Sequence, residues 1–278
     1  MLVRGIAVIL CSSVLLGAMA VCVRVATRDM PAGQVAFFRF LGSLLVLLAL
    51  RGRRSLRPNG LLPPVLLRGL LGGAAILIYY HAIGSAGAGL ATLLHCTYPI
   101  WTTMLATIFL GERVDARLAV ALGLFVAGIA VVVGPGADLG RGATTGSLTA
   151  LCSAMLAGGA VATARQLRRT ESAYLVTTYF MAVGALITAP ALLSGLPELT
   201  SGLQLALAGV VLTSVAGQVL LHQGLGFAPA TQASLAAATS VVSAAAFESL
   251  FIGEHLSPHT LLGAAILVLA VGLAVSRR

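Results

Sequence analysis

The sequence predicts an all-α membrane protein with ten transmembrane helices in two inverted-topology five-helix repeats. Three features predict this fold class: apolar composition in long blocks, an internal repeat, and a one-sided distribution of Arg. Of the 278 residues, 59% are hydrophobic and 9% are charged, whereas ordinary soluble domains carry about 25% charged residues. A soluble fold of this length could not bury so much apolar side chain.

The apolar blocks have the length that a membrane span needs. A helix rises ~1.5 Å per residue, so ~20 residues cross a ~30 Å hydrocarbon core. The N-terminal block, with Arg4 ahead of it, also looks like a signal peptide, but its match in mid-chain favours a retained helix. Gly, Pro and Arg punctuation gives predicted spans at 4–26, 33–50, 65–83, 88–110, 116–133, 146–165, 172–193, 203–224, 230–252 and 258–276.

The two halves of the sequence match each other at an offset of 141–142 residues. Matched segments include Leu10-Cys11-Ser12 with Leu151-Cys152-Ser153, Ala91-Thr92-Leu93 with Ala233-Ser234-Leu235, and Gly111-Glu112 with Gly253-Glu254. The repeats are predicted at 1–140 and 141–278. Because each repeat has an odd number of spans, the second must enter the membrane from the opposite side, as in transporters that expose one site alternately to either side.

The basic residues predict the orientation. The net charge is +9, and with the N-terminus inside, thirteen Arg fall on the inner side, three on the outer side and Arg39 within a span. The inner count includes Arg68, near the start of the third predicted span. This positive-inside bias predicts cytoplasmic termini and explains the net charge without nucleic acid. The Lys-free, Ala/Gly/Leu-rich composition is typical of a GC-rich bacterial gene, which predicts a multi-pass protein of the bacterial cytoplasmic (inner) membrane.

Short motifs then carry a family resemblance over essentially the whole chain. They are Ala36-Phe37-Phe38-Arg39-Phe40-Leu41, Tyr80-His81-Ala82, Tyr98-Pro99-Ile100, Leu110-Gly111-Glu112 and Ile252-Gly253-Glu254. With its ten spans, the chain resembles the drug/metabolite transporter superfamily in its EamA-type branch. That resemblance implies a carrier, in most members an exporter of amino acids, related metabolites or toxic compounds, and in some an importer of vitamins or cofactors. The family often has Pro in the ninth span, where this chain has Val241, so the two halves are expected to bend differently.

Polar and aromatic side chains within the spans are the candidate substrate-binding residues. Unsatisfied polar groups in hydrocarbon cost several kcal/mol, and aromatic faces can stack on a planar or cationic ligand. Trp101 lies near mid-span, where aromatic belts do not form, and shares a helix face with Tyr98. Helix packing is the alternative role for each. The third, fourth, eighth and ninth spans are expected to line a central cavity with Tyr80, His95, Tyr98, Trp101, Gln218, His222 and Ser243.

Three further residues are coupling or gating candidates. Arg39 lies about six residues into the second span, where a guanidinium can lock helices, snorkel, or hold a substrate carboxylate. Glu248 is an acid placed well inside a span, where it can carry a proton or be a partly hydrated helix-end residue. His81 can titrate near neutrality or simply pack.

A secondary carrier is the predicted function, with export favoured. The alternatives are import of a vitamin or cofactor by the same fold, an intramembrane enzyme, and a scaffold or channel. The sequence has no H-E-x-x-H, G-x-S-x-G or Walker motif, so it predicts no enzyme, no cofactor and no metal site. The expected partners are a small-molecule substrate, the lipid bilayer and protons as a candidate coupling ion, without nucleic acid. A monomer and a homodimer both remain open.

Overall fold

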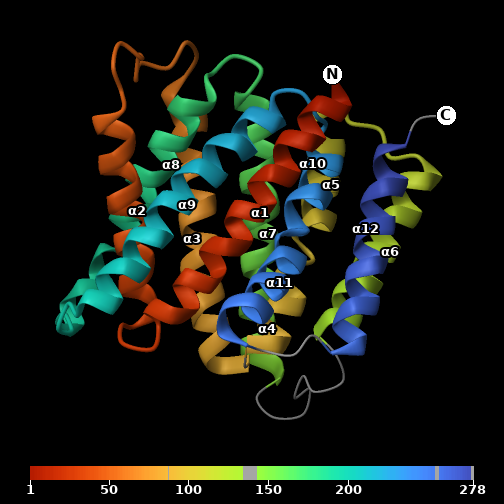
Figure 1. Cartoon of the computed structure of the whole chain (residues 1–278). Coiled ribbons are helices and arrows are strands. Elements are labelled where there is room, and N and C mark those ends of the chain that lie inside the picture. Colours follow the sequence, from red (N-terminus) through yellow and green to blue (C-terminus); the bar gives the residue numbers. More distant parts are fainter. Residues whose placement is uncertain (87, 134–142, 254–256, 277–278) are drawn as a thin grey trace.

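The structure is a computed structural model, and it describes residues 1–86, 88–133, 143–253 and 257–276. Nine of its helical segments are long and apolar enough to cross a membrane, and Ala116–Val132 is a shorter apolar helix. Together they correspond to the ten predicted spans and form a bundle of roughly parallel and antiparallel helices (Figure 1). The all-α membrane fold class is therefore confirmed.

The helix bounds lie within a few residues of the predicted spans. The first half contains α1 (Leu2–Ala26), α2 (Ala32–Ala49), α3 (Leu62–Ala86), α4 (Ala88–His95), α5 (Tyr98–Leu110) and α6 (Ala116–Val133). The second half contains α7 (Ala143–Leu167), α8 (Ala173–Thr188), the 3-10 helix η1 (Ala189–Ser194), α9 (Ser201–Leu225), α10 (Ala230–Ala238), α11 (Ser240–Ile252) and α12 (Pro258–Val275). The pairs α4–α5 and α10–α11 each form one interrupted span.

The helices pair as an inverted repeat requires. The first helix, α1, starts at the end of the bundle that carries the N-terminus, and α7 starts at the opposite end (Figure 1). Helix α1 packs along α9, and its counterpart α7 packs along α3, while α6 packs along α12. The predicted boundary between repeats, at residues 140 and 141, lies outside the described residues and remains a prediction.

The fourth and ninth spans are interrupted at corresponding residues, and the expectation that the two halves bend differently stays a prediction. The fourth span breaks at Thr97 (φ −74°, ψ −2°), and the ninth breaks at Thr239 (φ −64°, ψ −8°). In both, the threonine hydroxyl donates to the carbonyl three residues earlier, Leu94 at 2.6 Å and Ala236 at 2.7 Å. The shared threonine, which bonds the backbone locally, accompanies the break in both halves, so a proline is not required.

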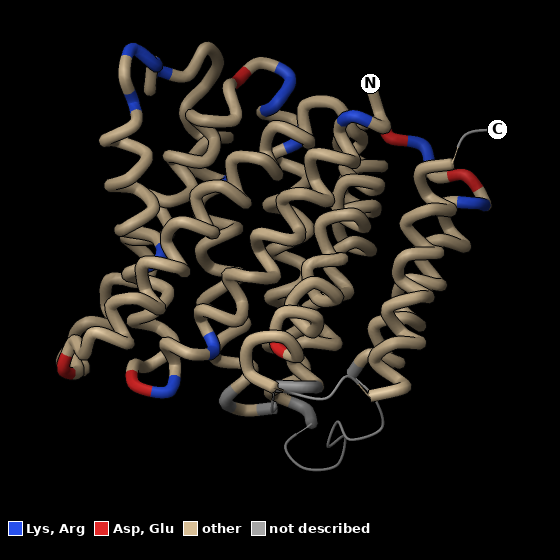
Figure 2. Tube along the Cα trace, in the orientation of Figure 1, with Lys and Arg blue, Asp and Glu red and all other residues tan. Residues whose placement is uncertain are grey.

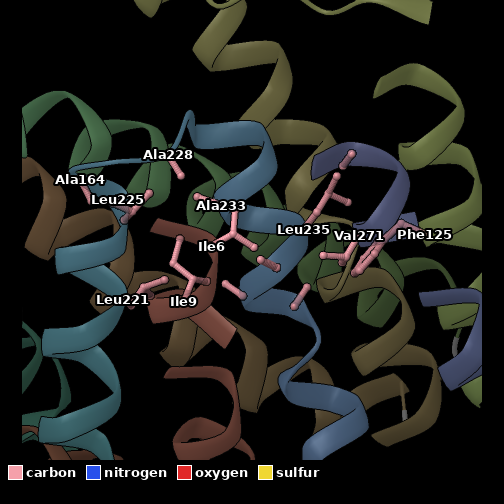
Figure 3. Close-up of a cluster of buried hydrophobic side chains, with 14 of the residues drawn as sticks. Ile6, Ile9, Phe125, Ala164, Leu221, Leu225, Ala228, Ala233, Leu235 and Val271 are labelled. Carbon is pink, nitrogen blue, oxygen red and sulfur yellow. The ribbon is translucent and has the colours of Figure 1, made fainter. Parts of the chain in front are cut away.

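Buried apolar side chains join the two halves. Figure 3 shows part of this cluster, in which small and branched side chains from α1, α6, α7, α9, α10 and α12 meet. Ile6, Ile9 and Leu225 in this cluster lie near the helix ends on the side of the bundle that carries the N-terminus. Apolar contacts on that side therefore help to hold the two halves together.

The outer surface of the bundle is apolar between its two ends. Large side chains are exposed along the helices, among them Leu45, Leu70, Ile108, Phe109, Leu186, Leu205, Leu212, Leu250, Phe251 and Leu269. Basic residues instead gather at the end of the bundle where α1 begins (Figure 2). An apolar band between polar or charged ends is the surface expected of a protein that spans a bilayer.

Candidate functional site

A column of buried polar side chains runs between α2 and α3 of the first half and α8 and α9 of the second. On α9, Ser214, Gln218 and His222 are spaced four residues apart and therefore share one helix face. Each is 7% exposed or less. We call the following set the polar column: Arg39, Arg68, Tyr80, Thr177, Ser214, Gln218 and His222.

Arg39 occupies one end of the polar column. It is 5% exposed, and its Nε donates to the Ser214 hydroxyl at 3.0 Å. Its guanidinium also hydrogen-bonds the Tyr80 side chain and lies 5.4 Å from the centre of the Phe40 ring. The predicted residues Arg39 and Tyr80 are thus brought together, and Arg39 is held inside the bundle rather than snorkelling outward.

His222 and Arg68 occupy the other end. The Nη2 of Arg68 lies 3.2 Å from His222 Nε2, and the Thr177 hydroxyl lies 2.7 Å from His222 Nδ1. Arginine can only donate, so His222 Nε2 accepts, and the ring is neutral with its proton on Nδ1. The Nδ1–H then donates to Thr177, whose own hydroxyl donates to the Ala173 carbonyl at 2.7 Å. Every proton in this chain of bonds is therefore assigned by elimination.

Arg68 is the site residue that sequence reasoning missed. It counts among the inner-side Arg that predict the orientation, but it lies within α3 and is only 4% exposed. Its guanidinium lies over the Phe180 ring, 4.2 Å from the ring centre, where a Cβ at Gly72 would collide with Nη1. Its position along the helix could have indicated a buried role, because Arg68 lies six residues after the start of α3 and Arg39 lies seven residues after the start of α2.

A second group of predicted residues forms an aromatic cluster around the interrupted span α4–α5. The His95 ring stacks on Tyr79, with centroids 4.3 Å apart, and its Nδ1 lies 2.6 Å from the Ser153 hydroxyl of α7. The Tyr98 hydroxyl donates to the Ser234 carbonyl of α10 at 3.2 Å. This cluster therefore joins α3, α4 and α5 of the first half to α7 and α10 of the second.

Trp101 and Ser243 lie at two corresponding helix crossings. A Cβ at Gly158 of α7 would lie 2.6 Å from the Trp101 Cβ, and a Cβ at Gly17 of α1 would lie 2.5 Å from the Ser243 Cβ. Both crossings join one half to the other. The glycines let the helix backbones approach closely, so these two candidate residues have a packing role, whatever else they do.

Two ion pairs link the halves at opposite ends of the bundle. Glu248 of α11 pairs with Arg24 of α1 at 3.0 Å. Glu112, which follows α5, lies 3.7 Å from Arg165 of α7 and also accepts from the Ala230 amide of α10 at 2.9 Å. Arg24 and Arg165 are counterparts at the 141-residue offset. Glu248, predicted as an isolated intramembrane acid, is therefore partnered and 26% exposed.

The structure separates His81 from the other candidates. His81 is exposed on the outer face of α3 and lines a surface hollow of about 530 Å³ between α3 and α7, with Leu77, Ile78, Leu148, Thr149 and Cys152. A second hollow of about 560 Å³ lies between α2 and α9 and is lined by apolar residues from Phe38 to Leu212. Neither hollow is lined by the predicted cavity-lining residues.

No metal site is assembled within the described residues, where no group of three His, Cys, Asp or Glu side chains lies close enough to hold an ion. The four cysteines of the sequence are free thiols, with Cys96 buried and Cys11 and Cys152 exposed on the apolar surface.

Comparisons with known proteins agree with this architecture. The chain is 28% identical to the pseudopaline exporter CntI of Pseudomonas aeruginosa, over 100% of this chain and 97% of that protein. It is 28% identical to an uncharacterized transporter of Archaeoglobus fulgidus, covering 97% and 96% of the two chains. It is 25% identical to human solute carrier family 35 member G1, over 90% of this chain and 73% of that protein.

A solved crystal structure shares the fold, with a TM-score of 0.83 and 18% sequence identity, over 98% of this chain and 96% of that chain. The EamA-like transporter family matches the chain twice, at residues 3–134 and 144–276. These two matches fall on the two halves that the helix pairing relates. The relatives are named as transporters or exporters, which points away from an enzyme. The chain is a multi-pass membrane protein that belongs to the EamA-like transporter family.

Proposed function

We propose that this protein is a secondary transporter that exports a small organic metabolite from the bacterial cytoplasm by alternating access. The observation that carries the proposal is the polar column, which lies between helices of the two halves. Substrate sites of inverted-repeat carriers lie near the bilayer midplane at the repeat interface. Export, rather than import, is supported by the relative named as an exporter.

The two ion pairs support an alternating mechanism. Arg24–Glu248 joins the halves at the end opposite the N-terminus, and Arg165–Glu112 joins them at the N-terminal end. A carrier of this kind must close one end while it opens the other, so one link at each end suits the two gates. We propose that Glu248 and Arg39 act on the outer side, and that both termini are cytoplasmic.

The substrate is proposed to contact both clusters. Tyr80 and Gln218 of the polar column would supply hydrogen bonds, and the Oε1 atom of Gln218 has no partner within the described part of the chain. His222, whose ring nitrogens are bonded to Arg68 and Thr177, would contribute to the site by orienting Arg68. Tyr98 and Trp101 would supply aromatic faces at the interrupted span. His95 and Ser243 complete the proposed site. His81, which lies on the outer face of α3, stays a weaker gating candidate.

The test has a binding step and a flux step. Purified protein is screened by thermal unfolding against amino acids, vitamins and organic cations, because a ligand of the folded state raises its apparent stability by mass action. Hits are then tested for counterflow in proteoliposomes. Trp101→Ala should weaken binding of a planar hit while Trp101→Phe weakens it less, and Leu205→Ala on the exposed face of α9 is the matched control. A ligand that binds but shows no trans-stimulated flux would contradict the transporter proposal.

A further inference from the structure

Arg68 carries a buried positive charge that its surroundings do not neutralise. Of its nitrogens, Nη2 donates to His222, while Nε and Nη1 are buried without a hydrogen-bond partner among the described residues. The Phe180 ring offers a cation–π contact at 4.2 Å. A buried guanidinium normally pairs with a carboxylate, because an uncompensated charge in a low-dielectric interior is costly.

Three acids of the described chain that are half-buried or buried have other partners. Glu248 pairs with Arg24, and Glu112 pairs with Arg165. Glu171 accepts from the amides of Asn59 and Gly60 in the loop before α3. The other charged group at this end of the polar column is Arg168, whose Nε donates to the His222 carbonyl. Both charges near His222 are therefore positive.

The repeat places Arg39 and Arg68 in corresponding surroundings. At the 141–142-residue offset, Arg39, Tyr80 and Ser214 correspond to Phe180, His222 and Gly72. Phe180 and Gly72 are the residues against which the Arg68 guanidinium lies, and His222 accepts its hydrogen bond. Phe180 of the second half is the counterpart of Arg39, so the second half has no arginine of its own at this position. The guanidinium of Arg68, which comes from α3, instead lies beside Phe180 and His222.

Each end of the polar column thus holds one buried guanidinium, Arg39 at one end and Arg68 at the other. Ser214, which contacts Arg39, and His222, which contacts Arg68, are eight residues apart on α9, or roughly 12 Å at 1.5 Å per residue. Two cations arranged along one path between the halves would attract an anion from either end. If an arginine served only to hold helices together, its N–H donors would be hydrogen-bonded to neighbouring groups. Arg39 Nε has such a partner, whereas Arg68 Nε and Nη1 have none among the described residues.

We infer that the transported metabolite is an organic anion whose carboxylate binds Arg68 on the N-terminal side of the bundle and is passed toward Arg39. This inference rests on the proposed function and names its substrate class. The carboxylate would accept from Nη1 or from Nε, the two donors that now lack partners. These donors lie on different edges of the guanidinium, and on either edge the second hydrogen of Nη2 would complete a planar pair that matches the carboxylate in charge and geometry. The neutral His222 ring holds the Nη2 atom and so fixes the orientation of the guanidinium.

The test measures binding without requiring transport. Thermal unfolding of purified protein is followed in succinate against its neutral isostere succinamide, and in benzoate against benzamide, with chloride balancing the ionic strength. We expect at least one carboxylate to raise the unfolding midpoint, and Arg68→Met to weaken that binding by roughly 30-fold or more, as expected for losing one partner of a buried charge pair. Arg113→Met, at an exposed inner loop, should bind as wild type. No stabilisation by either carboxylate, or equal stabilisation of Arg68→Met, would overturn the inference.

A second measurement separates function from folding. If Arg68 is kept for an anion, Arg68→Met should unfold at or above the wild-type midpoint in chloride, because it removes a buried unpaired charge. A clearly lowered midpoint would assign Arg68 to helix locking instead. Flux in proteoliposomes of a neutral or cationic compound, unaffected by Arg68→Met, would also overturn the inference and leave the transporter proposal standing. Carboxylate binding that depends on Arg68 but is accompanied by no flux would contradict the transporter proposal and support the anion site.

Discussion

Gly158 is a position at which a single added methyl group should separate the two halves. In Gly158→Ala, the new Cβ would lie 2.6 Å from the Trp101 Cβ and 2.7 Å from the Thr102 amide nitrogen. Carbon atoms pack at about 3.5–4.0 Å, so α5 and α7 would have to move apart by about 1 Å. Neither atom can rotate away, because one is backbone and the other is fixed to it.

The expected cost follows from overpacking, which is about 1–3 kcal/mol for one added methylene in a tight site. Replacing Gly by Ala in a helix also gains about 1 kcal/mol in backbone entropy and propensity. Gly123→Ala in α6 isolates that gain, because nothing lies within 4 Å of its Cβ position. Gly158→Ala should therefore be about 1–3 kcal/mol less stable than Gly123→Ala.

The assay is reversible unfolding of purified protein in mixed micelles, with both variants and wild type measured in parallel. Gly159→Ala is a second control, because its Cβ would meet only the ends of the Leu71 and Leu105 side chains, at 3.3 and 3.6 Å. Gly17→Ala should repeat the Gly158 result at the corresponding crossing, where Ser243 Cβ lies at 2.5 Å. If Gly158→Ala and Gly123→Ala are equally stable, the close crossing does not limit the packing of the halves.

Three more outcomes are expected. In a cysteine-free background, a cysteine at Arg53 should resist labelling from outside intact cells and one at Glu198 should be labelled, since the Arg distribution predicts a cytoplasmic loop at 51–64. The reverse pattern would invert the orientation. Glu248→Gln should abolish the pH dependence of transport in a folded protein, whereas an unchanged pH profile would restrict Glu248 to its ion pair. Thr239→Val and Thr97→Val should each destabilise by about 1 kcal/mol through one lost hydroxyl bond, and an effect confined to Thr239 would mean that Pro99 maintains the break near Thr97 without the hydroxyl.

The correspondence between the two repeats could be recognised from the sequence, but the contacts between their helices could not. The Ser12 hydroxyl donates to the Gly217 carbonyl at 2.7 Å, and its counterpart Ser153 donates to the Ala75 carbonyl at 3.0 Å. The matched Leu-Cys-Ser segments predicted that these serines correspond. Which carbonyl each would meet depends on the crossing of α1 with α9 and of α7 with α3, and pairing between distant helices leaves no periodic signal in one chain.

The sequence by itself determined the all-α membrane fold, the ten spans and their duplication, because crossing a bilayer imposes a length and an apolar composition that can be read from residue types. It also pointed to Arg39, Tyr80, Gln218 and His222, since polar residues are conspicuous in apolar helices. Only the tertiary structure decided that Arg68 joins them, that Glu248 is paired with Arg24, and that His81 faces outward. The physical reason is that a side chain's depth follows from its position along one helix, whereas its partners depend on how the helices are rotated and packed against one another.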